Sequence, residues 1–438
     1  MSDHAPHPLF RYRWLIFSVL ALAYFFVYFH RLSLSVVADT LVDDFNTTAG
    51  TMGLLGSIYF YCYAAMQLPA GLLSDSVGPR RTVTFFLIAG AVGSILFGLA
   101  PTIEIAFVGR ILVGLGVSMV FIPTMKILSQ WFYPHEFATM TGILNAVGGV
   151  GVLAATWLLA IMTGSFGWRL SFELIGGCTF VLVFLLWVIV RDRPQDNGWP
   201  SIEDLDNRAG SVDLSVQTIG LWAGLKKVFS HPRFWPLALW FFFDNGIFFG
   251  FGGLWGGPYL MHVYGLSRNT AGSVLSMIAW GMIFGSPLMG FFSDRVVKSR
   301  KIPIVMCSTL LVLLITGLYL CPTGLPLPLL YVVFFVFAVC AAAIVAIGFT
   351  SAKELFPVNM AGTSVGMVNL FPFIGGAVYM PLLGALLDAY PASPSGVYST
   401  EGYTRMLLVL LISALIALGC ALMIKETHIR RQSSPGRG

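Results

Sequence analysis

The sequence predicts an all-α membrane protein with twelve transmembrane helices, arranged as two pseudo-symmetric bundles of six. Three observations support this fold: a shortage of charged residues, a series of long apolar runs, and patterns that recur in both halves. Hydrophobic residues make up 57% of the 438 residues and charged residues only 10%, whereas a soluble domain carries about 25% charged residues. Most of the chain is therefore expected to lie out of contact with water.

Twelve apolar segments are long enough to cross a bilayer, which takes about 20 residues in a helix. They are expected at residues 14–37, 52–73, 83–101, 105–128, 137–162, 170–190, 235–262, 271–292, 302–321, 326–349, 365–387 and 404–424. The first begins after a polar, proline-containing start and is too long for the apolar part of a signal peptide.

Lysine and arginine are distributed unevenly between the two sides of this arrangement. If the amino terminus is inside, 19 of the 25 lie in inner segments and 3 in outer segments, while Arg31, Arg110 and Lys126 fall within spans. Loops rich in Lys and Arg stay in the cytoplasm. We therefore expect a multi-pass protein of the cell inner (plasma) membrane, surrounded by lipid, with both termini cytoplasmic. The net charge of +5 then needs no nucleic-acid partner.

The longest polar stretch divides the chain into three parts. We expect an N-terminal six-helix bundle at 1–191, a cytoplasmic linker at 192–232 and a C-terminal six-helix bundle at 233–438. Within the linker, the pattern at 221–229 is typical of a short amphipathic helix on the membrane surface.

Two short patterns recur in both predicted bundles. GLLSD at 71–75 matches GFFSD at 290–294, and ATMTGILN at 138–145 matches AGTSVGMVN at 361–369 with one inserted residue. Because both matches occur in the same order and at the same topological places, they indicate a duplicated unit.

Enzymatic chemistry has no support in the sequence. There is no nucleotide-binding loop, metal-ligand cluster or nucleophile triad, and the six cysteines fall in apolar runs without a CxxC pair. We expect no enzyme activity, no cofactor and no metal, and energy from an ion gradient.

The loop between the second and third spans resembles the major facilitator superfamily. The residues that carry the resemblance in this loop are Gly71, Asp75, Gly78, Arg80, Arg81 and Thr82. A partial copy of the loop pattern occurs at Gly290, Asp294, Arg295, Lys298 and Arg300. The fourth span adds a second family pattern, Arg110-x-x-x-Gly114-x-Gly116. The resemblance covers essentially the whole chain. It implies two bundles that rock about a central site.

The charged residues of these loops are predicted to act in gating. Asp75 lies where the second span leaves the membrane, and it can pair with Arg80 or Arg81 or cap a helix. Such a pair would hold one conformation closed and break when the bundles rock; an ordinary solvated turn is the alternative. Asp294 would act in the second bundle. In the family, the arginine matching Arg110 is tied to gating or coupling.

A weaker resemblance points to organic anions. Three stretches look like the anion:cation symporters: Tyr28-Phe29-His30-Arg31, Tyr63-x-x-x-Gln67-x-Pro69-x-Gly71 and Pro123-Thr124-x-Lys126-x-x-x-x-Trp131-Phe132. The organophosphate:phosphate antiporters also carry an Arg matching Arg31. Two positions depart from the symporters, which have acids where this chain has His30 and Val117. The seventh-span Arg of the antiporters is also missing.

Charged side chains inside a membrane are costly and mark candidate sites. Arg31 and Lys126 are predicted to bind a carboxylate or phosphate in a central cavity, because a guanidinium offers two parallel donors. Alternatively, Arg31 pairs with Asp244, and Lys126 extends its ammonium group to the cytoplasm. Uncharged residues predicted to orient the anion are Tyr28, Tyr63, Gln67, Asn145 and Asn369.

Asp244 and His30 are the candidates for proton coupling. Asp244 is the one acid well inside a predicted span, and intramembrane acids serve in proton relays. The alternatives are that Asp244 is a permanent ion-pair partner of Arg31 or Lys126 and that His30 is a neutral, hydrogen-bonded core residue.

Three functions are compatible with these features. The first is a monomeric, proton-coupled carrier of a small organic anion, with protons or another ion as the coupling partner. The second is a proton-driven drug or metabolite exporter, although the fifth span lacks the Gly-Pro signature that exporters commonly carry. The third is a sensor on a transporter scaffold, although no signalling domain is evident in the sequence.

Overall fold

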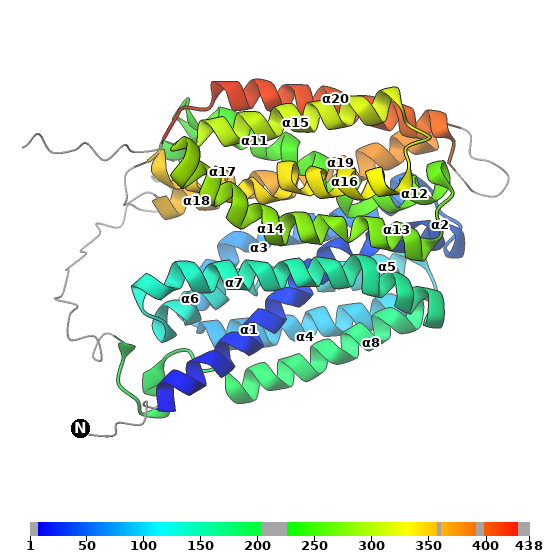
Figure 1. The fold of residues 1–438 in the computed structure, drawn as a ribbon. Coiled ribbons are helices and arrows are strands. Elements are labelled where there is room, and N and C mark those ends of the chain that lie inside the picture. The colour runs from blue at the N-terminus through cyan, green and yellow to red at the C-terminus, as the bar shows by residue number, and fades with distance from the viewer. Residues whose placement is uncertain (1–7, 203–225, 357–360, 391–397, 428–438) are drawn as a thin grey trace, which may run out of the picture.

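The computed structural model describes residues 8–202, 226–356, 361–390 and 398–427, and within them the chain forms helices joined by short turns, with no β-strand. Most of the predicted linker helix at 221–229 lies outside the described residues, which resume at residue 226. Twelve helical crossings follow one another along the chain, as predicted, and form two bundles, one above the other in Figure 1.

The first bundle contains six crossings. They are formed by α1 (Pro8–Leu32), α3 (Ala49–Ser76), α4 (Pro79–Gly98), α5 (Ile103–Ser118) continued by α6 (Phe121–Trp131), α7 (Pro134–Leu153), and α8 (Leu159–Ile189). A short helix, α2 (Ala38–Asp44), joins the first two crossings. The first part of α8 extends α7 through a π-helical turn. Gly167, with φ 77° and ψ 163°, interrupts α8 and starts the sixth crossing.

The second bundle repeats the arrangement. Its crossings are α11 (Phe234–Ile247) with α12 (Gly256–Tyr264), α13 (Arg268–Leu275) with α14 (Met277–Phe291), α15 (Lys301–Leu320), α16 (Leu327–Ala338) with α17 (Val345–Glu354), α18 (Ala361–Val368) with α19 (Leu370–Asp388), and α20 (Thr400–Met423). Phe248–Trp255, between α11 and α12, is π-helical. Such turns are frequent at functional positions.

Length and composition support membrane insertion. Within the described residues, ten helical runs are long and apolar enough to cross a membrane, and one of them, Thr139–Ile189, contains the break at Gly167. Large hydrophobic side chains such as Phe85, Phe184 and Leu313 are exposed on the outside of the bundles, where lipid would cover them. The chain is a multi-pass membrane protein.

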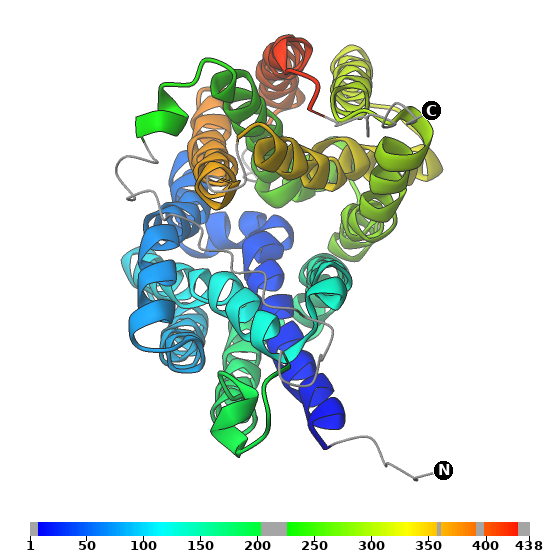
Figure 2. The same cartoon turned by 90° about the vertical axis from the view of Figure 1, so that its left-hand side faces the viewer.

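The two sides of the molecule can be distinguished by the chain ends. Tyr12, near the start of α1, donates a hydrogen bond to the carbonyl of Ile189, and Glu426, after α20, accepts hydrogen bonds from the amides of Arg300 and Lys301. Both described ends therefore lie on one side, here called the terminal side, which faces the viewer in Figure 2. The other is called the opposite side.

Candidate functional site

Arg31 lies at the boundary between the two bundles, enclosed by aromatic rings from both. Its guanidinium carbon is 4.6 Å from the ring centre of Tyr28 and 5.1 Å from that of Tyr63, in the first bundle. It is 5.8 Å from Phe249 and 5.3 Å from Phe373, in the second. The residue is only 7% exposed. These cation–π contacts, together with the hydroxyls of Tyr59 and Tyr63 beside the guanidinium, hold its plane.

No acid neutralises Arg31 within the described part of the chain. It forms none of the ion pairs found there, and its Nε has no hydrogen-bond partner. Asp244, its alternative partner from the sequence, is fully buried on α11, and both of its carboxyl oxygens lack a hydrogen bond. The electrostatic neighbours of Asp244 are the thiols of Cys307 and Cys340. The alternative of an Arg31–Asp244 ion pair is therefore wrong for this conformation.

A second arginine lies in the core of the first bundle. Arg110, on α5, is 2% exposed, and its Nη1 donates to the backbone carbonyl of His30 at 3.2 Å. Its guanidinium carbon is 5.4 Å from the ring of Tyr59. His30 is also buried, and neither ring nitrogen has a hydrogen-bond partner. This cluster thus holds two buried guanidinium groups and a histidine.

The predicted uncharged site residues divide into two groups. Tyr28 is half-buried in contact with Arg31, and a Cβ on Gly148 of α7 would meet its ring, so α1 and α7 pack closely here. Asn145, exposed one turn earlier on α7, accepts a hydrogen bond from Tyr24 at 3.3 Å. Tyr28 and Tyr63 thus contact Arg31 directly, and Asn145 is linked to Tyr28 through Tyr24, whose ring centre is 5.3 Å from that of Tyr28.

Gln67 and Asn369 lie farther along their helices. Gln67 donates to the carbonyl of Tyr63 at 3.4 Å and is partly exposed one turn beyond it on α3. Asn369 is half-buried at the junction of α18 and α19, four residues before Phe373. They lie on the terminal side of Arg31.

Lys126 is not beside Arg31. Its Nζ lies 2.5 Å from Oδ1 of Asp75 and 2.9 Å from the carbonyl oxygen of Ser74. Since Tyr63 contacts Arg31 and Asp75 is twelve residues farther along α3, the two cations are separated by roughly 18 Å of helix, at 1.5 Å per residue. Asp75 was predicted to pair with Arg80 or Arg81, and its partner in the structure is instead Lys126. This position of Lys126 does not fit the prediction that it lines the anion site.

Arg80 binds the start of the chain segment that follows α8. Its backbone amide donates to Oδ1 of Asp192 at 2.6 Å, and its guanidinium contacts the carbonyl and the ring of Trp187. Burial raises the pKa of the Asp192 carboxyl, and the hydrogen bond from Arg80 opposes that effect. Arg81 is exposed.

The second bundle has its own charge cluster on the terminal side. Arg300 contacts the carboxylates of Asp294 and Glu354, and its distance to Glu354 Oε1 is 3.1 Å. Burial lowers the pKa of Arg300, but hydrogen bonds to these two acids outweigh it, so the net pKa is raised. The two repeated loops are therefore tied within their own bundles.

Contacts that join the bundles lie on the opposite side, and sequence reasoning missed them. The Asp388 carboxylate, at the end of α19, accepts hydrogen bonds from the amides of Ala49 (2.8 Å) and Gly50 (2.6 Å), which begin α3. His262 Nε2 lies 2.7 Å from Oδ1 of Asp39, and Arg268 donates to the hydroxyl of Thr40. In the sequence, Asp388 is recognisable only as an acid that follows an apolar run. Its partners are backbone amides, which no residue type in the sequence indicates.

Four glycines at the helix ends on the terminal side have open space beside them. A Cβ added to Gly71 of α3, Gly142 of α7, Gly290 of α14 or Gly366 of α18 would meet no atom within 4 Å. By contrast, one added to Gly53, near the other end of α3, would lie 2.4 Å from the carbonyl oxygen of Met380. The two bundles are thus in close contact on the opposite side, whereas these four positions on the terminal side have open space beside them.

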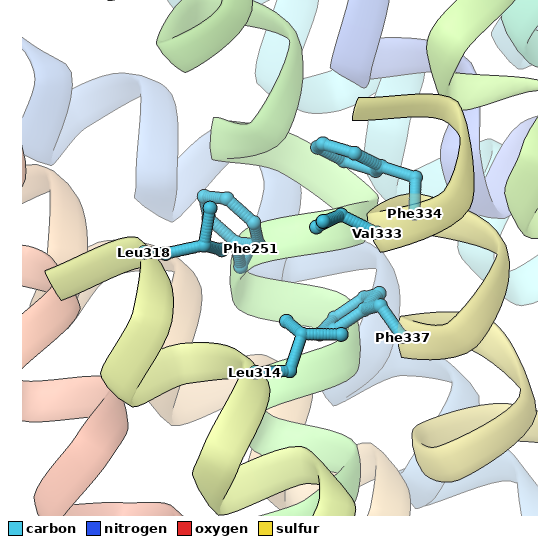
Figure 3. Close-up of a pocket in the computed structure, with 6 residues that line it drawn as sticks. All are labelled: Phe251, Leu314, Leu318, Val333, Phe334 and Phe337. Atoms are coloured by element: carbon cyan, nitrogen blue, oxygen red, sulfur yellow. The ribbon is translucent and has the colours of Figure 1, made fainter. Parts of the chain in front are cut away.

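A pocket in the second bundle is unrelated to this site. Figure 3 shows that its walls are apolar side chains from three crossings: Phe251, Leu314, Leu318, Val333, Phe334 and Phe337. It offers no group that would bind an anion. In the described residues, no cluster of His, Cys, Asp and Glu could hold a metal ion.

Comparisons with known proteins bear on the family and the fold. The family model described as Major Facilitator Superfamily matches residues 20–377 and 248–437. The probable galactarate/D-glucarate transporter GarP of Escherichia coli (strain K12) is 25% identical over 435 residues, covering 94% of each chain. The membrane sensor protein UhpC of the same organism is 25% identical over 389 residues, covering 84% of each.

A solved structure shares the fold. A bacterial homologue of the human lysosomal transporter Spinster, in an inward-facing and occupied conformation, superposes with a TM-score of 0.77 at 18% identity, covering 96% of this chain and 97% of the other.

Proposed function

Because the chain belongs to the Major Facilitator Superfamily, we propose that it is a secondary active transporter that moves a small organic anion across the inner membrane by alternating access. The observation that carries the proposal is Arg31, a buried guanidinium between the two bundles with aromatic contacts and no acidic partner among the described residues. A buried cation of this kind is costly unless a ligand compensates it. A carboxylate or phosphate matches its paired donors.

Alternating access is supported by the asymmetry between the two sides. If the terminal side is cytoplasmic, as the Lys and Arg distribution predicts, the site is accessible from the cytoplasm and sealed from outside by contacts such as Asp388 with Gly50. This corresponds to an inward-facing state. Transport would require these contacts to open while the helix ends at Gly71 and Gly366 close.

Residues around Arg31 would orient the anion. Tyr28, Tyr63 and Asn145 supply hydroxyl and amide groups on the first-bundle side, with Gln67 and Asn369 on the route to the terminal side. This set suits an anion with further polar groups, a class that includes the sugar diacids named for the relative GarP. Asp75, Lys126, Arg80 and Asp294 would act at the cytoplasmic ends of the helices.

Proton coupling remains a prediction for Asp244 and His30. Both are buried and neither side chain has a hydrogen-bond partner, so either could exchange a proton without breaking an ion pair. Neither contacts Arg31 through an ion pair in the described residues.

The sensor alternative has one observation in its favour, the similarity to UhpC, whose name describes a membrane sensor. A sensor could bind an anion at the same residue. The exporter alternative predicts preference for apolar or cationic compounds, which the positive charge of Arg31 and Arg110 disfavours.

A binding screen followed by transport tests the proposal. Purified protein would be titrated calorimetrically with glucarate, galactarate and glucose 6-phosphate, and with glucose as the neutral control. We expect at least one anion to bind and glucose not to bind, and the bound anion to enter proteoliposomes. Binding without any transport would favour the sensor, and preference for cationic compounds would favour the exporter.

A further inference from the structure

Tyr59, which is not among the residues predicted for the anion site, lies next to both buried arginines of the first bundle. It belongs to α3 and its side chain is fully buried. Its hydroxyl is beside the guanidinium of Arg31 on α1. Its ring centre is 5.4 Å from the guanidinium carbon of Arg110 on α5. One side chain therefore links the two cations.

The hydroxyl of Tyr59 is fixed by α1 itself. It donates a hydrogen bond to the carbonyl oxygen of Val27 at 3.2 Å. Val27 precedes Arg31 by four residues on α1, so this bond is made to the helical turn that carries Arg31. Because its single proton is used on Val27, the hydroxyl can act toward the guanidinium only as an acceptor.

Arg110 holds the same turn of α1 at a second point. Its Nη1 donates to the carbonyl oxygen of His30 at 3.2 Å. Since α1 ends at Leu32, this carbonyl is one of the last four of the helix, which have no partner within it. A cation at the C-terminal end of a helix is favourable. Tyr59 and Arg110 thus brace the backbone on the N-terminal side of Arg31.

The position of Tyr59 is itself set by packing. A Cβ added to Gly114 of α5 would lie 3.1 Å from the Cα and from the backbone oxygen of Tyr59, so α3 and α5 are in close contact at this residue. The ring of Tyr59 also stacks on that of Tyr63, at 5.9 Å between centres, and Tyr63 contacts Arg31. A group supported in this way can hold a neighbouring side chain in one orientation.

We propose that Tyr59 is a positioning residue of the anion site, whose hydroxyl holds the guanidinium of Arg31 in the orientation that binds the anion. The inference rests on the proposed function and adds to it a residue that acts through Arg31 without touching the ligand. A long side chain that is ordered before the ligand arrives loses less conformational entropy on binding. The anchor at Tyr59 therefore raises the affinity for the anion.

The test removes the hydroxyl and keeps the ring. Wild type and Tyr59→Phe would be titrated calorimetrically with glucarate, or with glucose 6-phosphate if that is the anion that binds the wild type. We expect the Kd of Tyr59→Phe to rise by at least about fivefold. In proteoliposomes, the half-saturating concentration for uptake should rise by the same factor, while the maximal rate stays within about twofold of wild type.

Tyr259→Phe is the matched control. Tyr259, on α12 of the second bundle, is also fully buried, and its hydroxyl donates to the carbonyl oxygen of Pro322 at 2.8 Å. This variant loses the same kind of buried hydrogen bond, so its unfolding temperature should fall about as much as that of Tyr59→Phe. Its affinity for the anion should equal that of wild type. Equal loss of affinity in the two variants would show a general effect of stability and overturn the positioning role.

A double substitution tests whether Tyr59 acts through Arg31. In the Arg31→Lys background the planar fork is absent, so adding Tyr59→Phe should lower the affinity further by less than about twofold. The same loss in both backgrounds, or unchanged affinity in Tyr59→Phe alone, would overturn the inference while leaving the proposed function in place. Absence of anion binding by the wild type would instead overturn the proposed function, and the inference with it.

Discussion

The ammonium group of Lys126 binds Asp75 at 2.5 Å and thereby ties α6 to the end of α3 on the terminal side of the first bundle. Asp294, which matches Asp75 in the repeated pattern, is held by Arg300 in the second bundle. In this conformation, each of these acids is therefore occupied within its own bundle. Movement of the two bundles toward each other on the terminal side would require these pairs to rearrange.

Asp75→Asn is predicted to reduce transport with little effect on stability. The side chains of Lys126 and Asp75 are 38% and 74% exposed, so solvent screens the pair and its loss should change the free energy of unfolding by less than about 1 kcal/mol. Anion uptake and thermal unfolding would be measured on the same variant. Asp196→Asn, which breaks the exposed pair with Arg193, is the control and should transport normally. Unchanged uptake in Asp75→Asn would reduce Asp75 to a turn residue.

Asp388→Asn is predicted to favour the outward-facing state. The carboxylate accepts two amide hydrogen bonds at the start of α3, and helix caps of this kind contribute about 1 kcal/mol. Loss of this cap should raise the ratio of outward-facing to inward-facing protein by about fivefold. The readout is labelling by an impermeant maleimide of Ser35→Cys, a buried position between the bundles, with the six native cysteines replaced by serine.

The matched control for this experiment is Glu401→Gln, which removes a loose pair with Arg405 at 3.9 Å on the same side. It should leave the labelling rate as in the parent protein. Equal labelling in Asp388→Asn and its parent would show that Asp388 does not hold the outer side closed.

Two glycines on α3 are predicted to respond differently to alanine. At Gly53 a Cβ would lie 2.4 Å from a backbone oxygen of α19, so Gly53→Ala should destabilise this conformation by about 1–3 kcal/mol. At Gly71 a Cβ would meet nothing within 4 Å, so Gly71→Ala should be neutral or stabilise the helix by up to about 1 kcal/mol. The unfolding temperature of each variant would be compared with that of the wild type. Equal destabilisation of the two variants would contradict the packing described for α3.

The orientation is tested by labelling from outside intact cells. Gln195, which follows α8, and Glu104, which begins α5, are both exposed. The distribution of Lys and Arg places the first in the cytoplasm and the second outside. An impermeant maleimide should therefore label Glu104→Cys and not Gln195→Cys in the cysteine-free background. The reverse pattern would invert the topology and with it the direction in which the site opens.

The sequence was sufficient to predict the twelve crossings, because a 20-residue apolar run has few alternatives to a membrane helix. The predicted span at 52–73 became α3 at Ala49–Ser76, and the span at 404–424 became α20 at Thr400–Met423. Gly167 breaks α8 where the sequence placed a turn between two spans.

The pairing of charged residues could not be read from the sequence. Lys126 and Asp75 are 51 residues apart, and only the packing of α6 beside α3 brings them together. The contacts of Asp388 with Ala49 and Gly50 join residues about 340 positions apart through backbone amides, which leave no side-chain signal. Arg31 was recognisable because an unpaired charge in an apolar span is costly in any packing.

The most direct test of the account is a calorimetric titration of wild type, Arg31→Lys and Arg31→Ala with the anion that binds in the screen, glucarate or glucose 6-phosphate. Arg31→Lys keeps the charge but loses the planar pair of donors, so its affinity should fall by at least about tenfold. Arg31→Ala should lose binding by more than about a hundredfold while its thermal unfolding still shows a folded protein. Equal affinity in Arg31→Ala and wild type would show that Arg31 is structural and that the anion site lies elsewhere.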